Sequence, residues 1–404
     1  MPTDLLYTAI GMKDYRPLSS SDRAGVLSLN MQPPESALRC PECKSTDVKR
    51  RGTVDRKVYA PPIGLRTTLI SIKTPRVECR ICDCVRNIEL PKVVPLKNHT
   101  KSFARLAVDL RKMMTVVDVS MYLGVSESMI RGIDKTYLNR KFAKPKLGHL
   151  KYLAIDEISV RKGHKYLTIV MDLVSGAVVF VGDGKGEESL KPFWKRLHGS
   201  RAKIQAVATD MSSAYYKAVQ KNLPSASHVF DRFHIVKLMN DKLTDLRREL
   251  HRQAEDGTEK LALKGTRWLL LKNPQSLDAD RNEHQRLEDA LQLNRSLAIA
   301  YYLKEDLRQI WEQSGKREAG KFLTDWCARA KASGISVLKT MSKTLETHRK
   351  GILAWYDHRI STGPLEGLNN KIKTLKRQAY GFRDLIYFKL KIYAIHLAKF
   401  ELIG

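Results

Sequence analysis

The chain has 404 residues, 43% of them hydrophobic, which is enough for two or three domains with real cores and excludes a disordered tail. It carries 72 Lys and Arg against 43 Asp and Glu, and the net charge of +29 indicates a polyanionic partner such as nucleic acid. No run of about 18 apolar residues is present. The first residues also lack the pattern of a signal peptide, so we expect a cytoplasmic protein without a membrane partner.

Five of the six cysteines lie close together in the amino-terminal part of the chain. In a protein that is not exported, such clustering favours a metal site over disulfides. Two CxxC sequences supply four thiolates, which complete the tetrahedron of a closed structural Zn²⁺ site and leave no open position for catalysis. The predicted ligands are Cys40, Cys43, Cys79 and Cys82. Cys84 could replace Cys82, although the repeated spacing favours Cys82.

The segment between the two CxxC sequences alternates apolar and polar residues around a Pro-Pro-Ile-Gly turn, which predicts a β-hairpin. This hairpin is basic, and we expect its cations to face phosphate. They are Lys49, Arg50, Arg51, Arg56 and Lys57. Residues 1–95 are therefore predicted to form a zinc ribbon domain.

A helix-turn-helix domain is predicted in residues 96–148. Apolar residues from Phe103 to Met114 fall on one face of a helix, and a second helix over 117–123, Gly124 and a third helix that opens at Ser126 follow. If this motif binds DNA, the early residues of the last helix face the bases. These residues are Ser126, Glu127, Ser128 and Arg131, with Lys135 nearer the DNA backbone. An ordinary αα-hairpin has the same pattern, but the charge of the chain favours DNA binding. Residues 139–149 are predicted to be a linker.

Residues 149–236 are predicted to form the first part of a catalytic core. Three short β-rich runs follow one another as antiparallel strands, and strand–helix units come after them. The predicted strands are Tyr152–Ile158, Tyr166–Leu173, Ala177–Val181, Ile204–Ala208 and His228–Phe230. This is the ribonuclease H-like order, in which the first and fourth strands lie side by side.

Three carboxylates stand out in this arrangement. Asp156 and Asp210 lie in or directly after the first and fourth strands, and Glu366 opens a lysine-rich helix. Mg²⁺ takes oxygen ligands and is usually held by a few carboxylates and substrate phosphate, so the three acids predict a two-metal site for phosphodiester chemistry. Acids that end strands are also common turn formers. Glu157 should point away from the metal, because neighbouring residues in a strand face opposite sides.

Residues 237–355 show several apolar stripes at helical spacing and no strand pattern, which predicts an all-α insertion. We expect its tryptophans to lie in the core. Residues 356–404 complete the catalytic core with the helix of Glu366 and an apolar terminal helix that packs back on the core. Cations on the Glu366 helix are expected to hold the phosphodiester; they include Lys371, Lys373 and Arg377.

Five motifs together resemble the ISL-three family of bacterial insertion-sequence transposases, within the DDE group. They are CPEC…CRIC, AIDEIS, ATDMSSAY, HVFDRFHIVK and STGPLEGLNNKIKTLKRQAYGFRD, and the resemblance covers nearly the whole chain. It implies that Asp156, Asp210 and Glu366 are the metal-binding triad. It also marks Asp231 and His234 as an accessory element near the active site, although a histidine at a helix start can merely pack.

The predicted fold is therefore multidomain α+β: a zinc ribbon, a helix-turn-helix domain and a ribonuclease H-like α/β core interrupted by an all-α insertion. The predicted function is DNA transposition. The enzyme would bind terminal inverted repeats and target DNA as a homodimer associated with the bacterial nucleoid. Cleavage and strand transfer would use two Mg²⁺ ions, for which Mn²⁺ can substitute, besides the structural Zn²⁺. The alternatives are a transposase-derived DNA-binding regulator without catalysis and a nuclease of the same fold without strand transfer.

Overall fold

The computed structural model describes residues 8–161, 165–255 and 257–396. The chain divides into two compact units, which are described separately. Unit 1 comprises residues 1–143 and 374–404, and unit 2 comprises residues 144–373. No described helix is long and apolar enough to span a membrane.

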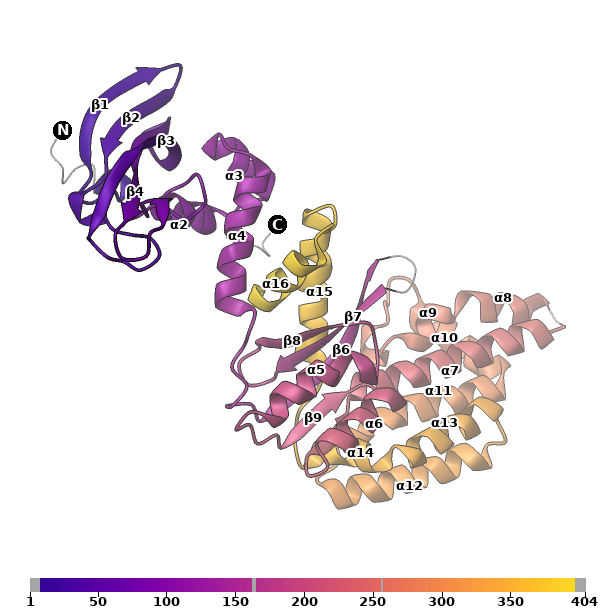
Figure 1. The fold of residues 1–404 in the computed structure, drawn as a ribbon. Coiled ribbons are helices and arrows are strands. Elements are labelled where there is room, and N and C mark those ends of the chain that lie inside the picture. The colour runs from indigo at the N-terminus through magenta and orange to yellow at the C-terminus, as the bar shows by residue number, and fades with distance from the viewer. Residues whose placement is uncertain (1–7, 162–164, 256, 397–404) are drawn as a thin grey trace. The chain divides into compact units, whose positions relative to one another are not determined.

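The amino-terminal part of unit 1 is a five-stranded sheet, drawn in indigo and violet in Figure 1. Its strands are β1 (Arg16–Arg23), β2 (Val26–Gln32), β3 (Val48–Ile63), β4 (Arg66–Cys79) and β5 (Val85–Asn87), with the short helix η1 (Glu35–Ala37) after β2. β3 and β4 pair antiparallel, which confirms the predicted hairpin. Gly64 supplies the turn with a φ of 60°, a backbone conformation that glycine adopts without steric cost. The sequence did not predict β1 and β2, which extend the sheet along β4.

Three helices follow in unit 1: α2 (Lys101–Leu110), α3 (Val116–Leu123) and α4 (Glu127–Phe142). Gly124 ends α3 in the left-handed conformation, with a φ of 65°. The Ser126 hydroxyl accepts a hydrogen bond from the Met129 amide and caps α4. The turn at Gly124 and the start of the third helix at Ser126 are thus confirmed, but α2 ends at Leu110 and does not reach Met114, and α4 continues to Phe142. The prediction of a linker from residue 139 is wrong for its first four residues.

The last described helix of unit 1, α16 (Leu385–Ala394), packs against α4. Leu138 of α4 and Tyr387, Leu390 and Ala394 of α16 share one apolar cluster. The sequence placed this terminal helix with the catalytic core, whereas the structure buries it in unit 1. Apolar periodicity shows that a helix has a face to bury, but not which surface covers it.

Unit 2 is built on a second five-stranded sheet with the order β10-β9-β6-β7-β8. The strands are β6 (Tyr152–Arg161), β7 (Lys165–Asp172), β8 (Val178–Asp183), β9 (Ala206–Thr209) and β10 (Ser227–Phe230). β6, β7 and β8 are antiparallel neighbours, while β9 pairs parallel with both β6 and β10. This is the predicted arrangement, with the first and fourth strands side by side. The helices α5 (Glu187–His198) and α6 (Ser213–Asn222) bury Phe193 and Tyr215 among the apolar side chains of the sheet.

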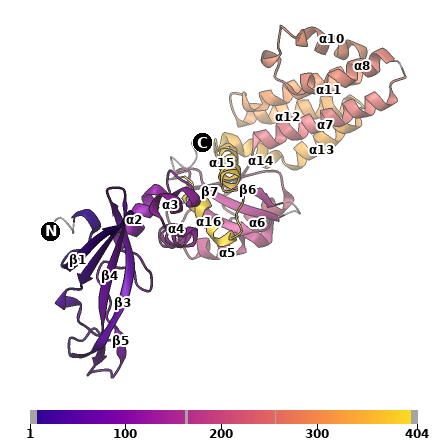
Figure 2. The ribbon, with the colours of Figure 1, turned by 90° about the horizontal axis from the view of Figure 1, so that it is seen from above.

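From residue 232 to the end of α15, the described residues form helices and no strand, as predicted for the insertion. They are α7 (Arg232–Gln253), α8 (Gly257–Gly265), α9 (Arg267–Leu271), α10 (Glu283–Leu293), α11 (Arg295–Arg308), α12 (Lys316–Ala332), α13 (Ser336–Thr347), α14 (Arg349–Leu353) and α15 (Gly363–Gln378), with the short helices η2 (Pro274–Ser276), η3 (Gln309–Trp311) and η4 (Ala354–Tyr356). Figure 2 shows α7, α11, α12 and α13 as a bundle. A Cβ atom on Gly351 would lie 2.4 Å from the ring of Phe230, so only glycine lets α14 approach β10 this closely.

Candidate active site and DNA-contacting surfaces

Asp156 and Asp210 lie at adjacent positions of the sheet of unit 2. Ala154 of β6 pairs with Ala208 of β9 in parallel register, so continuing the register brings Asp156 beside Asp210, the residue after β9. Both side chains are half-buried. One carboxylate oxygen of Asp156 accepts a hydrogen bond from the Glu157 amide at 2.8 Å, and Asp210 accepts one from the Ser212 amide at 3.0 Å. The sheet itself therefore pairs the two acids.

The surroundings of Asp156 disfavour the ionised form of its carboxylate. Burial raises the pKa of Asp156 to about 6, and the negative charges of Glu157 and Asp210 act in the same direction. The hydrogen bond from the Glu157 amide and the positive charge of His234 lower this pKa. A divalent cation at this position would stabilise the ionised form.

Glu157 points away from Asp156, as strand alternation predicts. Its carboxylate accepts a hydrogen bond from the Tyr215 hydroxyl of α6 at 2.7 Å. Tyr215 also lies 3.3 Å from the hydroxyl of Thr168, on β7. Glu157 is thus a structural partner of α6, and Asp156 is the member of the pair that faces Asp210.

Helix α15 contacts the site through Asn369. The side-chain amide of Asn369 donates to the second carboxylate oxygen of Asp156 at 2.8 Å. Glu366 lies in the first turn of α15, one helical turn before Asn369, and is exposed. Among the described residues, the only three or more potential ligands whose atoms all lie within 4.8 Å of one another are cysteines. The structure therefore pairs Asp156 with Asp210 and places Glu366 one turn from Asn369, without a closed cage of three acids.

The donor set suits Mg²⁺. Its oxygens come from carboxylates, and the side-chain oxygen of Asn369 is buried without a hydrogen-bond partner among the described residues. A buried polar atom without a partner is costly unless something binds it. Asp156, Asp210 and Glu366 could hold the ions, and Asn369 would orient Asp156. Asn369 lies in the motif of Glu366, and the sequence alone did not predict a role for it.

Asp231 holds two elements of the site in place. Its carboxylate accepts a hydrogen bond from the Phe233 amide at 2.9 Å and so caps α7, on which His234 lies. It also accepts hydrogen bonds from the Thr362 amide, at 2.8 Å, and from the Thr362 hydroxyl. Thr362 immediately precedes α15, and both side chains are buried. Asp231 thus fixes the starts of α7 and α15 relative to each other.

Four thiols in unit 1 form the predicted metal centre. The sulfur atoms of Cys40, Cys43, Cys79 and Cys82 all lie within 4.8 Å of one another, which suits a tetrahedral Zn²⁺ with thiolate ligands. Cys79 ends β4, so the long hairpin brings the second CxxC to the first. The sulfur of Cys84 lies 3.3 Å from Cys40 and 3.4 Å from Cys82, so it borders the site.

Comparison with known proteins identifies the family. Residues 153–392 match the ISL3 model of DDE transposases, and residues 36–82 match the zinc finger of the transposases of IS204, IS1001, IS1096 and IS1165. The chain belongs to the ISL3 family of DDE transposases. It is 31% identical to the transposase of IS1001 from Bordetella parapertussis over 376 residues, which cover 92% of both chains. This transposase is an enzyme that acts on DNA.

Two further similarities are more distant. The transposase of IS1557 from Mycobacterium tuberculosis is 31% identical over 262 residues, which cover 59% of this chain and 58% of that one. A match to the solved structure of the Drosophila P element transposase strand transfer complex covers 73% of this chain and 91% of the matched chain. Its TM-score is 0.42, with 11% identity.

Several of the residues predicted to contact DNA in this transposase already form ion pairs. Arg131 pairs with Glu127 at 3.2 Å and Lys135 with Asp384 at 2.5 Å, while in the ribbon Arg50 pairs with Glu35 and Arg51 with Glu78. Exposed pairs of this kind contribute about 0–1 kcal/mol, so phosphate can replace the acid. Ser128 lies in the first turn of α4, and its hydroxyl is 3.0 Å from that of Ser126. Lys371, Lys373 and Arg377 lie exposed on α15.

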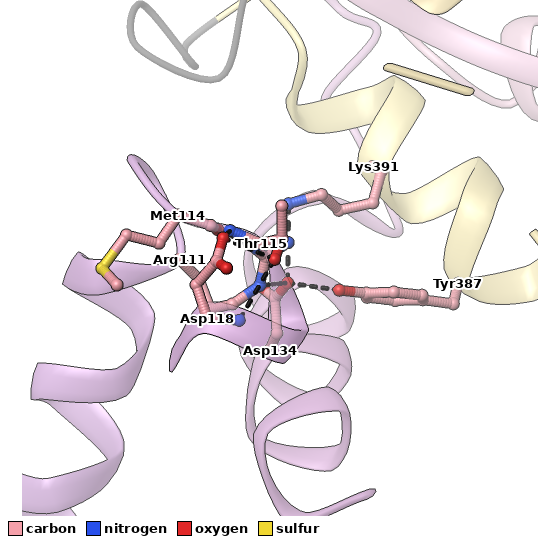
Figure 3. Close-up of polar contacts among 7 residues, drawn as sticks. All are labelled: Arg111, Met114, Thr115, Asp118, Asp134, Tyr387 and Lys391. Atoms are coloured by element: carbon pink, nitrogen blue, oxygen red, sulfur yellow. Dashed lines mark hydrogen bonds and ion pairs between the residues drawn. The ribbon is translucent and has the colours of Figure 1, made fainter. Parts of the chain in front are cut away.

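A buried ionic cluster fastens α16 to α4, and the sequence did not predict it. Asp134 of α4 faces Arg111 at 3.4 Å and Lys391 of α16 at 3.5 Å, and it accepts a hydrogen bond from the Tyr387 hydroxyl (Figure 3). All four side chains are buried. An acid on the apolar face of α4 and a lysine within an apolar helix were the available signals. The cluster holds the terminal helix of the transposase against the helix predicted to read DNA.

Proposed function

We propose that this transposase binds the terminal inverted repeats of an insertion sequence and catalyses metal-dependent cleavage and strand transfer. The observation that carries the proposal is the pairing of Asp156 with Asp210, joined to α15 by Asn369. Asp156, Asp210 and Glu366 would hold divalent ions, which would supply activation of the attacking oxygen and stabilisation of the leaving oxygen. Mg²⁺ suits the oxygen donors, and Mn²⁺ can substitute.

The residues of the chain would divide the remaining work. Asp156, Asp210 and Glu366 would be the ligands of the metal ions. Lys371 and Lys373 are exposed on the helix of Glu366 and would offset the charge that develops on the phosphodiester. After cleavage, the freed 3′-hydroxyl would attack target DNA at the same site, with no covalent enzyme intermediate. His234 lies close enough to influence the charge of Asp156 and would help to keep it ionised.

DNA recognition would fall to unit 1. In a helix-turn-helix, α4 would enter the major groove with Ser126, Glu127, Ser128 and Arg131 at the bases. The basic hairpin of the zinc ribbon, with Arg50 and Arg51, would meet the phosphates, as would Arg377. Two ends must be cut, so the active complex would contain at least two copies of the chain.

The test uses duplex oligonucleotides with the flanking inverted repeats of the element, Mg²⁺ and the full chain. Asp156→Asn, Asp210→Asn and Glu366→Gln should each abolish cleavage while end binding stays within about twofold, because each removes a metal ligand and not a DNA contact. Asp325→Asn, on an exposed part of α12, is the matched control. Substantial cleavage by one of the three variants would remove that residue from the site.

Two other results would point to other functions. End binding without cleavage under any divalent metal would indicate a DNA-binding regulator. Cleavage without joining of a pre-nicked end to target DNA would indicate a nuclease of the same fold.

A further inference from the structure

A basic pocket lies in the helical insertion, away from the carboxylates of the catalytic sheet. It has a volume of about 840 Å³ and is formed by the carboxyl-terminal half of α7 with α8 and α9. Four arginines and a lysine line it, which we call the arginine pocket: Arg247, Arg248, Arg252, Lys264 and Arg267. His251 and two acids, Asp245 and Glu249, complete the lining and offset only part of this charge.

The cations of the arginine pocket are crowded. Arg247 donates to the Leu263 carbonyl at 2.8 Å, and its Nε is buried without a partner among the described residues. Burial lowers the pKa of Arg247, and the charges of Arg248 and Arg267 lower it further. Arg248 has an acid nearby, Asp245, but at 3.3 Å on an exposed surface. Such an arrangement gains free energy when an anion enters.

An exposed aromatic side chain adjoins the pocket. Trp268 follows Arg267 and is 65% exposed, whereas Trp311 and Trp326 of the same insertion are buried. The expectation that Trp268 lies in the core is therefore wrong. The Arg267 guanidinium lies over the indole, 4.7 Å from the ring centroid. A large aromatic face held at the surface beside a cation is a platform on which a base can stack.

We propose that the arginine pocket and Trp268 form a binding site for an unpaired segment of DNA. Arg248, Arg252 and Lys264 would contact phosphates, and Trp268 would stack on a base. Four of the five cations are arginines, whose planar fork matches phosphate oxygens better than an ammonium does. The indole selects unpaired over duplex DNA, because a paired base does not offer its face. The choice of DNA as the nucleic acid rests on the proposed function.

The test measures binding of a 5′-labelled 12-nucleotide single strand to the Zn²⁺-loaded full chain without added Mg²⁺ or Mn²⁺, which prevents cleavage and leaves the zinc ribbon intact. Trp268→Ala should weaken binding by about 5- to 150-fold, the range for loss of one stacked base. Trp268→Phe should recover part of that loss. Tyr302→Ala removes another exposed aromatic of the insertion and should leave binding unchanged.

Salt titrations separate the phosphate contacts from the stacking contact. Arg248→Gln and Arg252→Gln should each flatten the log–log salt dependence by about 0.7, the value for one single-strand phosphate. Arg317→Gln, an exposed arginine on α12, is the charge-matched control. Trp268→Ala should leave the slope unchanged. Ultraviolet crosslinking of a strand that contains 5-bromodeoxyuridine should label the tryptic peptide of residues 268–272.

Three results would overturn the site. They are no single-strand binding by the parent chain, equal binding by Trp268→Ala and Tyr302→Ala, and crosslinking only outside the insertion. Equal weakening of heparin and DNA binding by Trp268→Ala would refute the base contact, since heparin has no bases. Cleavage of duplex ends with Mg²⁺ is assayed separately. If the chain does not cleave duplex ends but its single-strand binding still depends on Trp268, the proposed function is refuted and the single-strand site is supported.

Discussion

Removal of the Asp231 carboxylate should loosen the start of α15 and thereby impair cleavage. The carboxylate caps α7 and accepts both the amide and the hydroxyl of Thr362. In Asp231→Ala, the lost cap costs about 0.5–2 kcal/mol. The Thr362 donors then stay buried without an acceptor, at about 1–3 kcal/mol. Together, these terms give a loss on the order of 1.5–5 kcal/mol, concentrated where α7 and α15 begin.

Amide hydrogen exchange of the full chain measures this loss where it occurs. Peptides that cover the first turn of α15 should exchange faster in Asp231→Ala by a factor that corresponds to the lost free energy, about tenfold for each 1.4 kcal/mol. Asp231→Asn keeps one acceptor oxygen and should fall between the parent and the alanine variant. Asp325→Ala, on exposed α12, should change exchange by less than about 0.5 kcal/mol.

The cleavage assay distinguishes positioning from direct participation. If Asp231 acts through α15, the cleavage rate should fall in proportion to the loss of protection from exchange in α15. Asp231→Asn should retain part of the cleavage activity and part of this protection. Unchanged exchange in α15 together with complete loss of cleavage would refute this reasoning and place Asp231 among the reacting groups.

Three further predictions concern the metal, the ionic cluster and pH. Cys79→Ser should lose the bound Zn²⁺ and unfold the β3–β4 hairpin, whereas Cys327→Ser should keep one Zn²⁺ per chain by atomic emission. Asp134→Ala removes the carboxylate that Arg111 and Lys391 both face and should destabilise unit 1 by about 3–5 kcal/mol in urea unfolding; a loss under 1 kcal/mol would contradict a buried pairing. Burial, with a smaller contribution from the charge of His348, lowers the pKa of His228 to about 4. The unfolded chain takes up this proton near pH 6.5, so unit 2 should keep its full stability above that pH and lose up to about 3 kcal/mol as the pH falls to 4. His228→Gln should flatten this dependence.

The elements of the fold that were predictable are those set by short stretches of sequence. The two CxxC turns, the Gly124 turn and the Ser126 cap each depend on neighbouring residues, and the structure has all of them. The strand order of the catalytic sheet followed from the succession of elements, because few topologies connect three antiparallel strands to parallel neighbours. β1 was not predicted because nearly all of its side chains are exposed and give no apolar alternation. β2 does alternate Leu27, Leu29 and Met31 with polar residues, and this signal was missed.

Features that depend on distant partners were not predictable in the same way. Trp268 has the large apolar side chain of a core residue, yet it is exposed. Its exposure depends on how the helices of the insertion pack, which the sequence does not show. Asp134 reads as one polar residue on an apolar helix face, because its partner Lys391 lies 257 residues away. A single sequence records that a buried charge needs compensation but not which residue supplies it.

The three acids proposed to bind metal show why a motif locates a site without giving its geometry. Asp156 and Asp210 are paired by sheet register, which sequence order determines well. Glu366 lies on a helix, which no strand register positions. Its helix is held by the hydrogen bonds that Thr362 donates to Asp231 and Asn369 donates to Asp156. These partners lie 131 and 213 residues apart in the sequence. Because these contacts are buried and polar, they hold α15 only when every partner is present. Loss of either should therefore displace Glu366 while leaving Asp156 and Asp210 side by side, and the third acid is the one whose position depends most on the rest of unit 2.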